Sequence, residues 1–168
     1  MKNLTRIVTT LAMGSLLIAA SPNDHMINRD IKALSPDRAE KLKTGSGAGY
    51  ALPAELNGYP GPRHVLDLAD ALKLTKDQFR ETSQLFHQMK AEAIPLGRRI
   101  IEQERELDIL FRRGQANEES LFRLTAAIGE SESQLRATHL KYHLRMVPFL
   151  TAEQRAIYGR LRGYHGGH

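Results

Sequence analysis

The histidines of this chain are the side chains best suited to chemistry. His139 and His143 stand four residues apart in a segment with helical periodicity, so both project from one helix face. Two imidazole nitrogens at this spacing can bind one metal ion. Met146 follows one turn after His143, and His64 could approach from elsewhere in the chain. The hypothesis is a site for zinc, copper or nickel, and the alternative is a pair of solvated histidines.

The end of the chain carries two further histidines. Residues 163–168 read GYHGGH, which we interpret as a flexible Gly/His tail. His165 and His168 could capture the same metals loosely. His87 lies beside an apolar seam and is interpreted as a packing residue. Cysteine is absent, which excludes thiolate ligands and disulfide bonds.

A second kind of chemistry is suggested by arginines mixed with large apolar residues in the segment 98–113. Cationic groups can attract an unfolded chain over a long range, and apolar groups can then contact its exposed core residues. Such a surface could hold partly folded proteins weakly. The alternative is an ordinary solvated or packed helix face. The candidate residues are Arg98, Arg99, Ile101, Arg105, Leu110, Phe111, Arg112 and Arg113.

These side chains lie on helices that begin with a repeated phrase, LTKDQ at 74–78 and LTAEQ at 150–154. The threonine suits the N-cap, and the glutamine three residues later can reach back to it, which makes a capping box. The leucine before each threonine stands at the hydrophobic staple position. The residues of this motif are Leu74, Thr75, Gln78, Leu150, Thr151 and Gln154.

Apolar periodicity predicts four helices and no strands after residue 63. Their expected ranges are about 64–72, 75–113, 117–147 and 151–162. The loop between the second and third is short, so these two should form a long antiparallel hairpin. Pro95 should bend the second helix, or alternatively split it into two.

A hairpin of this length cannot cover all its apolar residues alone. Phe86, Ile101, Phe111 and Phe122 would remain partly uncovered. Because isologous dimers are the commonest oligomers, a homodimer is expected. The predicted fold class is therefore all-α, with four helices built on a long bent antiparallel hairpin that dimerises.

The first twenty residues are typical of a signal peptide. Lys2 and Arg6 precede a short apolar run that ends in small residues. The run is shorter than the ~20 residues of a spanning helix, although an uncleaved anchor is the alternative. The mature chain is thus expected to be exported, with no membrane span after signal cleavage.

Residues 21–63 are rich in glycine and proline and are interpreted as a linker, with one short helix starting at Ser35. The helical domain is predicted to cover 64–162. The chain of 168 residues has a net charge of +5, and removal of Lys2 and Arg6 leaves 5 − 2 = +3. Charges of both signs are mixed along the helices, which argues against a nucleic-acid partner.

The sequence also argues against an enzyme. It contains neither a nucleophile-elbow phrase nor an HExxH phrase. It also lacks a glycine-rich phosphate loop, so ATP use is not expected. No cofactor is required, although zinc, copper or nickel could bind.

The repeated LTxxQ phrase, the signal peptide, the absence of cysteine and the long hairpin resemble the Spy/CpxP family of periplasmic chaperones. They also resemble the related heavy-metal-resistance proteins of ZraP and CnrX type. The resemblance covers about residues 64–162. It implies a dimer or higher oligomer that acts as an ATP-independent chaperone, a modulator of envelope-stress sensor kinases, or a metal sensor.

The metal-binding branch of this family carries a His-x-x-x-Met pair near the second LTxxQ phrase. Met146 matches the methionine, but Tyr142 stands at the histidine position. That branch also carries a His-x-x-x-His pair on its first helix, whereas His64 is followed by Leu68.

The sequence therefore predicts an exported ATP-independent chaperone, or an envelope-stress modulator, of Spy/CpxP type. Its expected partners are a second copy of itself, partly unfolded envelope proteins, and a sensor kinase or regulator. The alternative is a periplasmic heavy-metal sensor or a metal-sequestering resistance protein.

Overall fold

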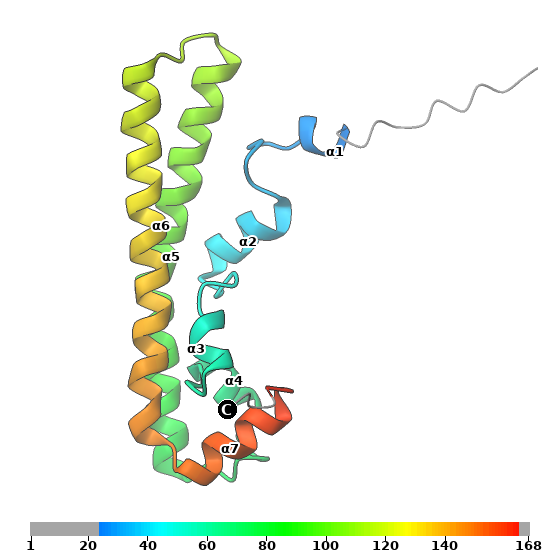
Figure 1. The fold of residues 1–168 in the computed structure, drawn as a ribbon, viewed down its shortest axis with the longest axis vertical. Coiled ribbons are helices and arrows are strands. Elements are labelled where there is room, and N and C mark those ends of the chain that lie inside the picture. Colours follow the sequence, from blue (N-terminus) through cyan, green and yellow to red (C-terminus); the bar gives the residue numbers. More distant parts are fainter. Residues whose placement is uncertain (1–23, 165–168) are drawn as a thin grey trace, which may run out of the picture.

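A computed structural model describes residues 24–164, which form helices, turns and loops without a strand. Two long helices, α5 (Lys76–Arg112) and α6 (Glu118–Met146), lie side by side and run in opposite directions (Figure 1). The all-α prediction is confirmed over these residues. None of the described helices combines the length and apolar character needed to cross a bilayer. The predicted signal peptide, residues 1–20, lies outside the described range.

The helix starts follow the predicted capping chemistry. Thr75 Oγ1 accepts a hydrogen bond from the Gln78 backbone N–H at 3.1 Å, and Gln78 Oε1 accepts one from the Thr75 N–H at 3.0 Å. The same box starts α7 (Ala152–Leu161) at Thr151. Asn117 caps α6, as its sequence position predicts.

Helix α5 runs through Pro95 without a break, so the alternative in which proline splits it is wrong. The first predicted helix, 64–72, is also corrected. It begins earlier and is shorter, as α4 (Pro62–Asp67), and turns follow it. Proline at the first helical position accounts for the earlier start, because its fixed φ suits that position and its missing N–H costs no helical bond.

The interpretation of residues 21–63 as a linker is wrong over the described part of that range. It forms α1 (Asp24–Ile27), α2 (Pro36–Thr44) and α3 (Leu52–Leu56). Ser35 caps α2 as predicted. The glycines of this segment end helices and make turns. Gly45, for example, ends α2 with φ +63°. The glycine and proline content therefore reflects helix ends in a packed segment.

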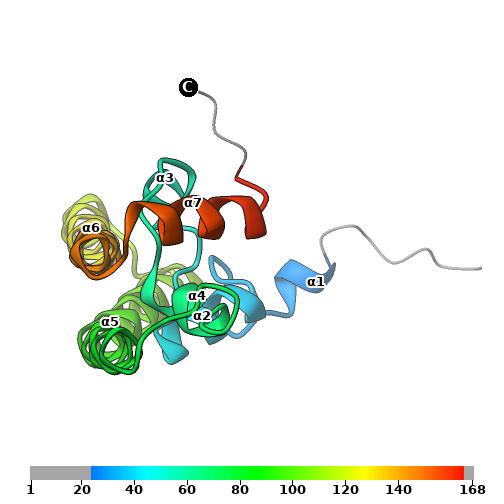
Figure 2. The ribbon, with the colours of Figure 1, turned by 90° about the horizontal axis from the view of Figure 1, so that it is seen from below.

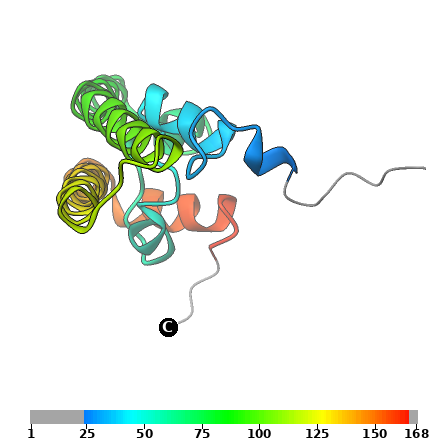
Figure 3. The same ribbon diagram turned by 90° about the horizontal axis from the view of Figure 1, so that it is seen from above.

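Two buried clusters hold these helices together. The first lies between α2, the loops beside it, α5 and α6, and contains Ile31, Leu34, Leu42, Ala93, Ile100, Ile101 and Leu135. The second joins α4 and α7 to the other end of the long pair and contains Val65, Leu72, Leu85, Met89, Tyr142, Met146, Leu150 and Tyr158. Views along the long axis show α2, α3, α4 and α7 gathered on one side of α5 and α6 (Figures 2 and 3).

The predicted flexible tail is corrected at its first two residues. The Tyr164 N–H donates to the Gly159 carbonyl at 2.8 Å, and its ring centroid lies 6.4 Å from that of Tyr158. Gly163 turns the chain with φ +70°, which places Tyr164 on the core. His165 and His168 lie outside the described residues.

Candidate functional site

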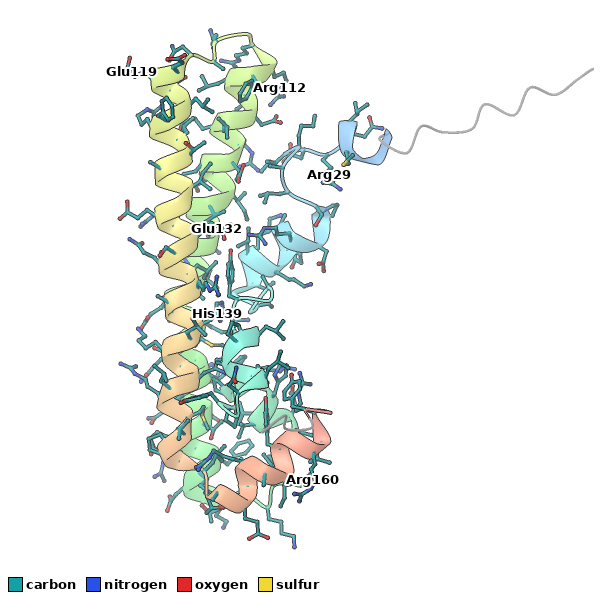
Figure 4. All side chains as sticks on the ribbon, in the orientation of Figure 1. Arg29, Arg112, Glu119, Glu132, His139 and Arg160 are labelled. Carbon is teal, nitrogen blue, oxygen red and sulfur yellow. The ribbon has the colours of Figure 1, made fainter. Side chains whose placement is uncertain are left out.

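The two histidines of α6 point into the protein. His139 is 1% exposed and His143 is 5% exposed, so the alternative of two solvated residues is wrong. The segment between α2 and α4, which the sequence did not predict to pack, covers them. Tyr50 from this segment stacks on His139 with ring centroids 6.2 Å apart. Figure 4 shows His139 in the middle of α6, on the side that faces this segment.

A buried carboxylate collects the neighbouring polar groups. Glu55 Oε1 lies 3.1 Å from His64 Nδ1 and 3.9 Å from His143 Nδ1. Glu55 Oε2 accepts a hydrogen bond from the Tyr158 hydroxyl at 2.5 Å. His143 Nδ1 also donates to the Tyr59 carbonyl at 2.8 Å. Glu55 therefore ties α3 to α4, α6 and α7.

Sequence reasoning missed Glu55 because it lies in the segment interpreted as a linker. A single glutamate among glycines and prolines carries no periodic signal of burial. The cluster packs tightly against Gly61. A Cβ atom there would lie 2.6 Å from His143 Cε1 and 2.9 Å from Glu55 Oε1, so a larger residue would displace one of these buried side chains.

Burial and hydrogen bonding act in opposite directions on Glu55. Burial alone would raise its pKa, but hydrogen bonds from His64 and Tyr158, together with the charge of His143, outweigh burial and lower the pKa. His139 has no compensating partner. Burial, with a smaller contribution from the charge of His143, lowers the pKa of His139 to about 4, so its ring is neutral at pH 7.

These shifts predict a loss of stability in acid. An unfolded chain binds a proton at His139 below pH 6.5, and the folded chain does not until about pH 4. The free energy of unfolding should therefore fall by up to about 3 kcal/mol between these values. The lowered pKa of Glu55 adds a further loss only below its ordinary value of 4.5.

Urea denaturation across pH 4 to 7 measures this effect. His139→Phe should flatten the profile above pH 4.5, because the ring stacked on Tyr50 is kept and the titrating nitrogens are removed. His87→Phe is the matched control, since the structure exposes His87 and corrects its interpretation as a packing residue. An unchanged slope in His139→Phe would contradict the assignment.

The predicted metal ligands are only partly brought together. His64 and His143 meet at Glu55, and His139 borders the same cavity. Met146 is fully buried in the second cluster. Among residues 24–164, no three histidine, aspartate or glutamate side chains are arranged to hold a metal ion. Metal binding by these residues thus stays a prediction.

The predicted client-binding residues divide between surface and core. Arg98, Arg99 and Arg113 are exposed, and in the described part of the chain none of them has a carboxylate within ion-pair distance. Phe111 is 60% exposed. Leu110 is half-buried. Ile101 is only 6% exposed, which corrects its place in this set, because α2 covers it.

Two of the arginines are engaged in ion pairs. Arg105 lies 3.3 Å from Asp30, and Arg112 lies 3.3 Å from Asp108. Figure 4 shows Arg112 near the loop that joins α5 to α6. Across that loop, α6 exposes Phe122 by 69%. The sequence predicts that Phe122 is uncovered, but does not assign it to the client-binding set.

The two LTxxQ phrases meet through their glutamines. Gln78 Nε2 donates to Gln154 Oε1 at 2.9 Å, and Gln154 Nε2 donates back to Gln78 Oε1 at 3.0 Å. Each amide also donates to a backbone carbonyl of the other segment, that of Phe149 or Leu72. Both donors and the oxygen of each amide are thereby used. The sequence predicts the two caps, but this reciprocal pair was missed.

Comparison with family models, with curated proteins and with solved structures finds no match to this chain.

The Spy/CpxP resemblance therefore stays a prediction made from residues of the chain itself. The repeated phrase forms two capping boxes, and these boxes are joined by a fully bonded amide pair. The motif therefore has a structural role in this protein, where it fixes the start of α7 against the start of α5.

Proposed function

We propose that this chain is an exported periplasmic protein that binds partly unfolded envelope proteins without ATP, as the Spy/CpxP resemblance implies. The observation that carries the proposal is the pair of exposed rings, Phe111 and Phe122, beside the α5–α6 loop. We define the distal surface as Leu110, Phe111, Arg112, Arg113 and Phe122; the exposed Arg98 and Arg99 lie roughly 20 Å further back along α5.

Two phenylalanine rings are left in water on this surface, at 60% and 69% exposure. Full burial of one such side chain stabilises a folded protein by about 1.5–3 kcal/mol, so exposed rings near one loop favour a partner. Arg98, Arg99 and Arg113, which have no ion-pair partner in the described part of the chain, supply attraction over a distance without requiring a fixed geometry. A weak, adaptable site of this kind suits release without nucleotide.

A second copy of the chain is the other expected occupant of apolar surface on the long pair. In this proposal α5 and α6 act as a hairpin, curved at Pro95, and the protomers associate as a homodimer. A sensor kinase or regulator that reads the free and client-bound forms would be a further partner. Sedimentation at micromolar concentration tests the dimer directly.

Client protection should depend on the two exposed rings. With Phe111→Ser and Phe122→Ser combined, affinity for a chemically unfolded client should fall roughly tenfold or more, since each ring would contribute about 1 kcal/mol. The assay is light scattering of the aggregating client at near-stoichiometric chaperone, without ATP. Helicity of the variant should stay unchanged, because the rings are outside the core.

The matched control is Leu144→Ser combined with Leu161→Ser. These leucines are 61% and 52% exposed but lie away from the distal surface. The control should protect the client as well as the unmodified protein. Equal protection by the phenylalanine double variant would refute the assignment of the distal surface.

A second candidate function is periplasmic metal sensing or sequestration. It is favoured by the approach of His64 and His143 to one carboxylate. Calorimetric titration with zinc, copper and nickel tests it, and His139→Ala combined with His143→Ala should abolish binding. Client protection independent of chelator, with no tight metal binding, would favour the chaperone.

A further inference from the structure

A cavity of about 590 Å³ lies between the segment 41–64, α5, α6 and the end of the chain at Tyr164. This volume falls within the roughly 300–1,000 Å³ typical of sites for small organic ligands. Phe86 and Met89 supply apolar surface on the α5 side. The loop 45–49 supplies glycine-rich backbone. The cavity is separate from the distal surface.

The charged groups of the cavity are mostly cationic. Four permanent cations line it, against one carboxylate, and that carboxylate, Glu55, already accepts bonds from His64 and Tyr158. The four are Lys41, Arg63, Lys90 and Arg162. A cavity of this charge attracts anions and disfavours cations.

The cations differ in how far they are already engaged. Lys41 lies 2.7 Å from Asp37, and Arg63 lies 3.0 Å from Asp67. Lys90 has no carboxylate within ion-pair distance in the described residues, and its Nζ lies 5.8 Å from the centroid of the Phe86 ring. Lys90 thus places an uncompensated charge beside an aromatic face.

His139 provides an independent sign of a ligand. Its Nε2 is buried and has no hydrogen-bond partner, and its ring borders the cavity. A buried polar atom left without a partner is costly, and native proteins contain few of them. A small rotation of the ring toward the cavity would bring Nε2 within reach of a ligand atom, which could satisfy it because this nitrogen of a neutral imidazole can donate or accept one hydrogen bond.

We infer that this cavity binds a small organic anion with a flat apolar body. The anionic group would be attracted by Lys90 and Arg162, the apolar body would pack on Phe86 and Met89, and a polar atom would bond His139 Nε2. The site would tie the segment 41–64 to the long helices when occupied, because the ligand would contact both.

The test uses 2-naphthoate as the probe and 2-naphthamide as its uncharged counterpart, added to the mature protein in the presence of a chelator. Calorimetry should show one saturable site for naphthoate and at least roughly tenfold weaker binding of naphthamide. In NMR spectra the His139 ring signal, identified by its loss in His139→Phe, should shift on addition of naphthoate.

Lys90→Gln should weaken naphthoate binding several-fold and leave naphthamide binding unchanged. Lys76→Gln, at an exposed lysine of α5 that does not line the cavity, is the matched control and should bind as the unmodified protein does. His139→Phe should weaken both probes.

Three results would overturn the inference. The first is no saturable binding of naphthoate up to about 1 mM. The second is equal binding by Lys90→Gln and the unmodified protein, and the third is binding that leaves the His139 signal in place. Circular dichroism of each variant separates loss of binding from loss of folding.

Discussion

Gly97→Ala should destabilise the protein by about 3 kcal/mol and release α2 from α5. A Cβ atom at residue 97 would lie 2.1 Å from the carbonyl oxygen of Leu42 and 2.8 Å from its carbonyl carbon. Both atoms belong to the backbone of α2, so no side chain can rotate away. The helix would have to withdraw, and Leu42, which is 1% exposed, would lose its place in the first cluster.

The matched control is Gly129→Ala, also inside a long helix. A Cβ atom at residue 129 would meet nothing within 4 Å. Alanine should stabilise α6 there by about 0.5–1 kcal/mol, because glycine is a poor helix former. Urea denaturation gives the free energies, and hydrogen exchange of residues 36–44 reports whether α2 is released. Similar effects of the two substitutions would show that α2 does not dock at Gly97.

Gln154→Leu should cost about 2–4 kcal/mol, measured as the free energy of unfolding. Leucine has nearly the right volume for this buried site but no polar atoms. The substitution removes the N3 half of the capping box at Thr151, the bond to the Leu72 carbonyl and both bonds to the Gln78 amide. The groups left behind would be partly buried without partners, which is the costly outcome.

Two further variants separate the contribution of the capping box to stability from that of the Gln78–Gln154 amide pair. Gln134→Leu, at an exposed glutamine of α6 with one bond to Glu130, should change stability by less than about 0.5 kcal/mol. Gln154→Glu keeps an acceptor for the Thr151 N–H but loses the donor to Gln78 and Leu72. It should therefore destabilise the protein clearly, and a neutral effect would show that only the cap matters.

Local sequence signals predicted the local structure well. Thr75, Asn117 and Thr151 start helices because capping depends on a few neighbouring residues, which the sequence displays directly. The same signals could not show that Gln78 and Gln154 pair, because that contact joins residues 76 positions apart. The bond from the Thr151 N–H to Gln154 Oε1 caps α7 whether or not Gln154 also pairs with Gln78.

The segment before residue 64 shows where composition misled the prediction. Glycines at residues 45, 49 and 58 adopt positive φ and close turns between short helices. Short helices in a packed segment lack the long apolar periodicity that identifies α5 and α6. The cavity, Glu55 and the burial of His139 all depend on this segment, so the sequence identified the histidines but not their environment.

The predicted client-binding residues show a different limit of sequence-based prediction, which is that it does not show which residues of a long helix are covered. The heptad-like spacing of α5 could not separate Ile101, which α2 covers, from Phe111, which nothing described covers. Both are apolar residues on one helix, and their difference arises from a partner helix distant in sequence. Candidate surfaces on long helices therefore need the tertiary structure before residues are assigned to them.

Site-specific photo-crosslinking tests the central claim most directly. A benzophenone side chain would replace Phe111, Phe122 or, as controls, Leu144 and Leu161, and each variant would be irradiated with a reduced, unfolded client in the absence of ATP. The account predicts client adducts from residues 111 and 122, and few from residues 144 and 161. Adducts mainly from residues 144 and 161, or none from any position while the protein still protects the client, would contradict it.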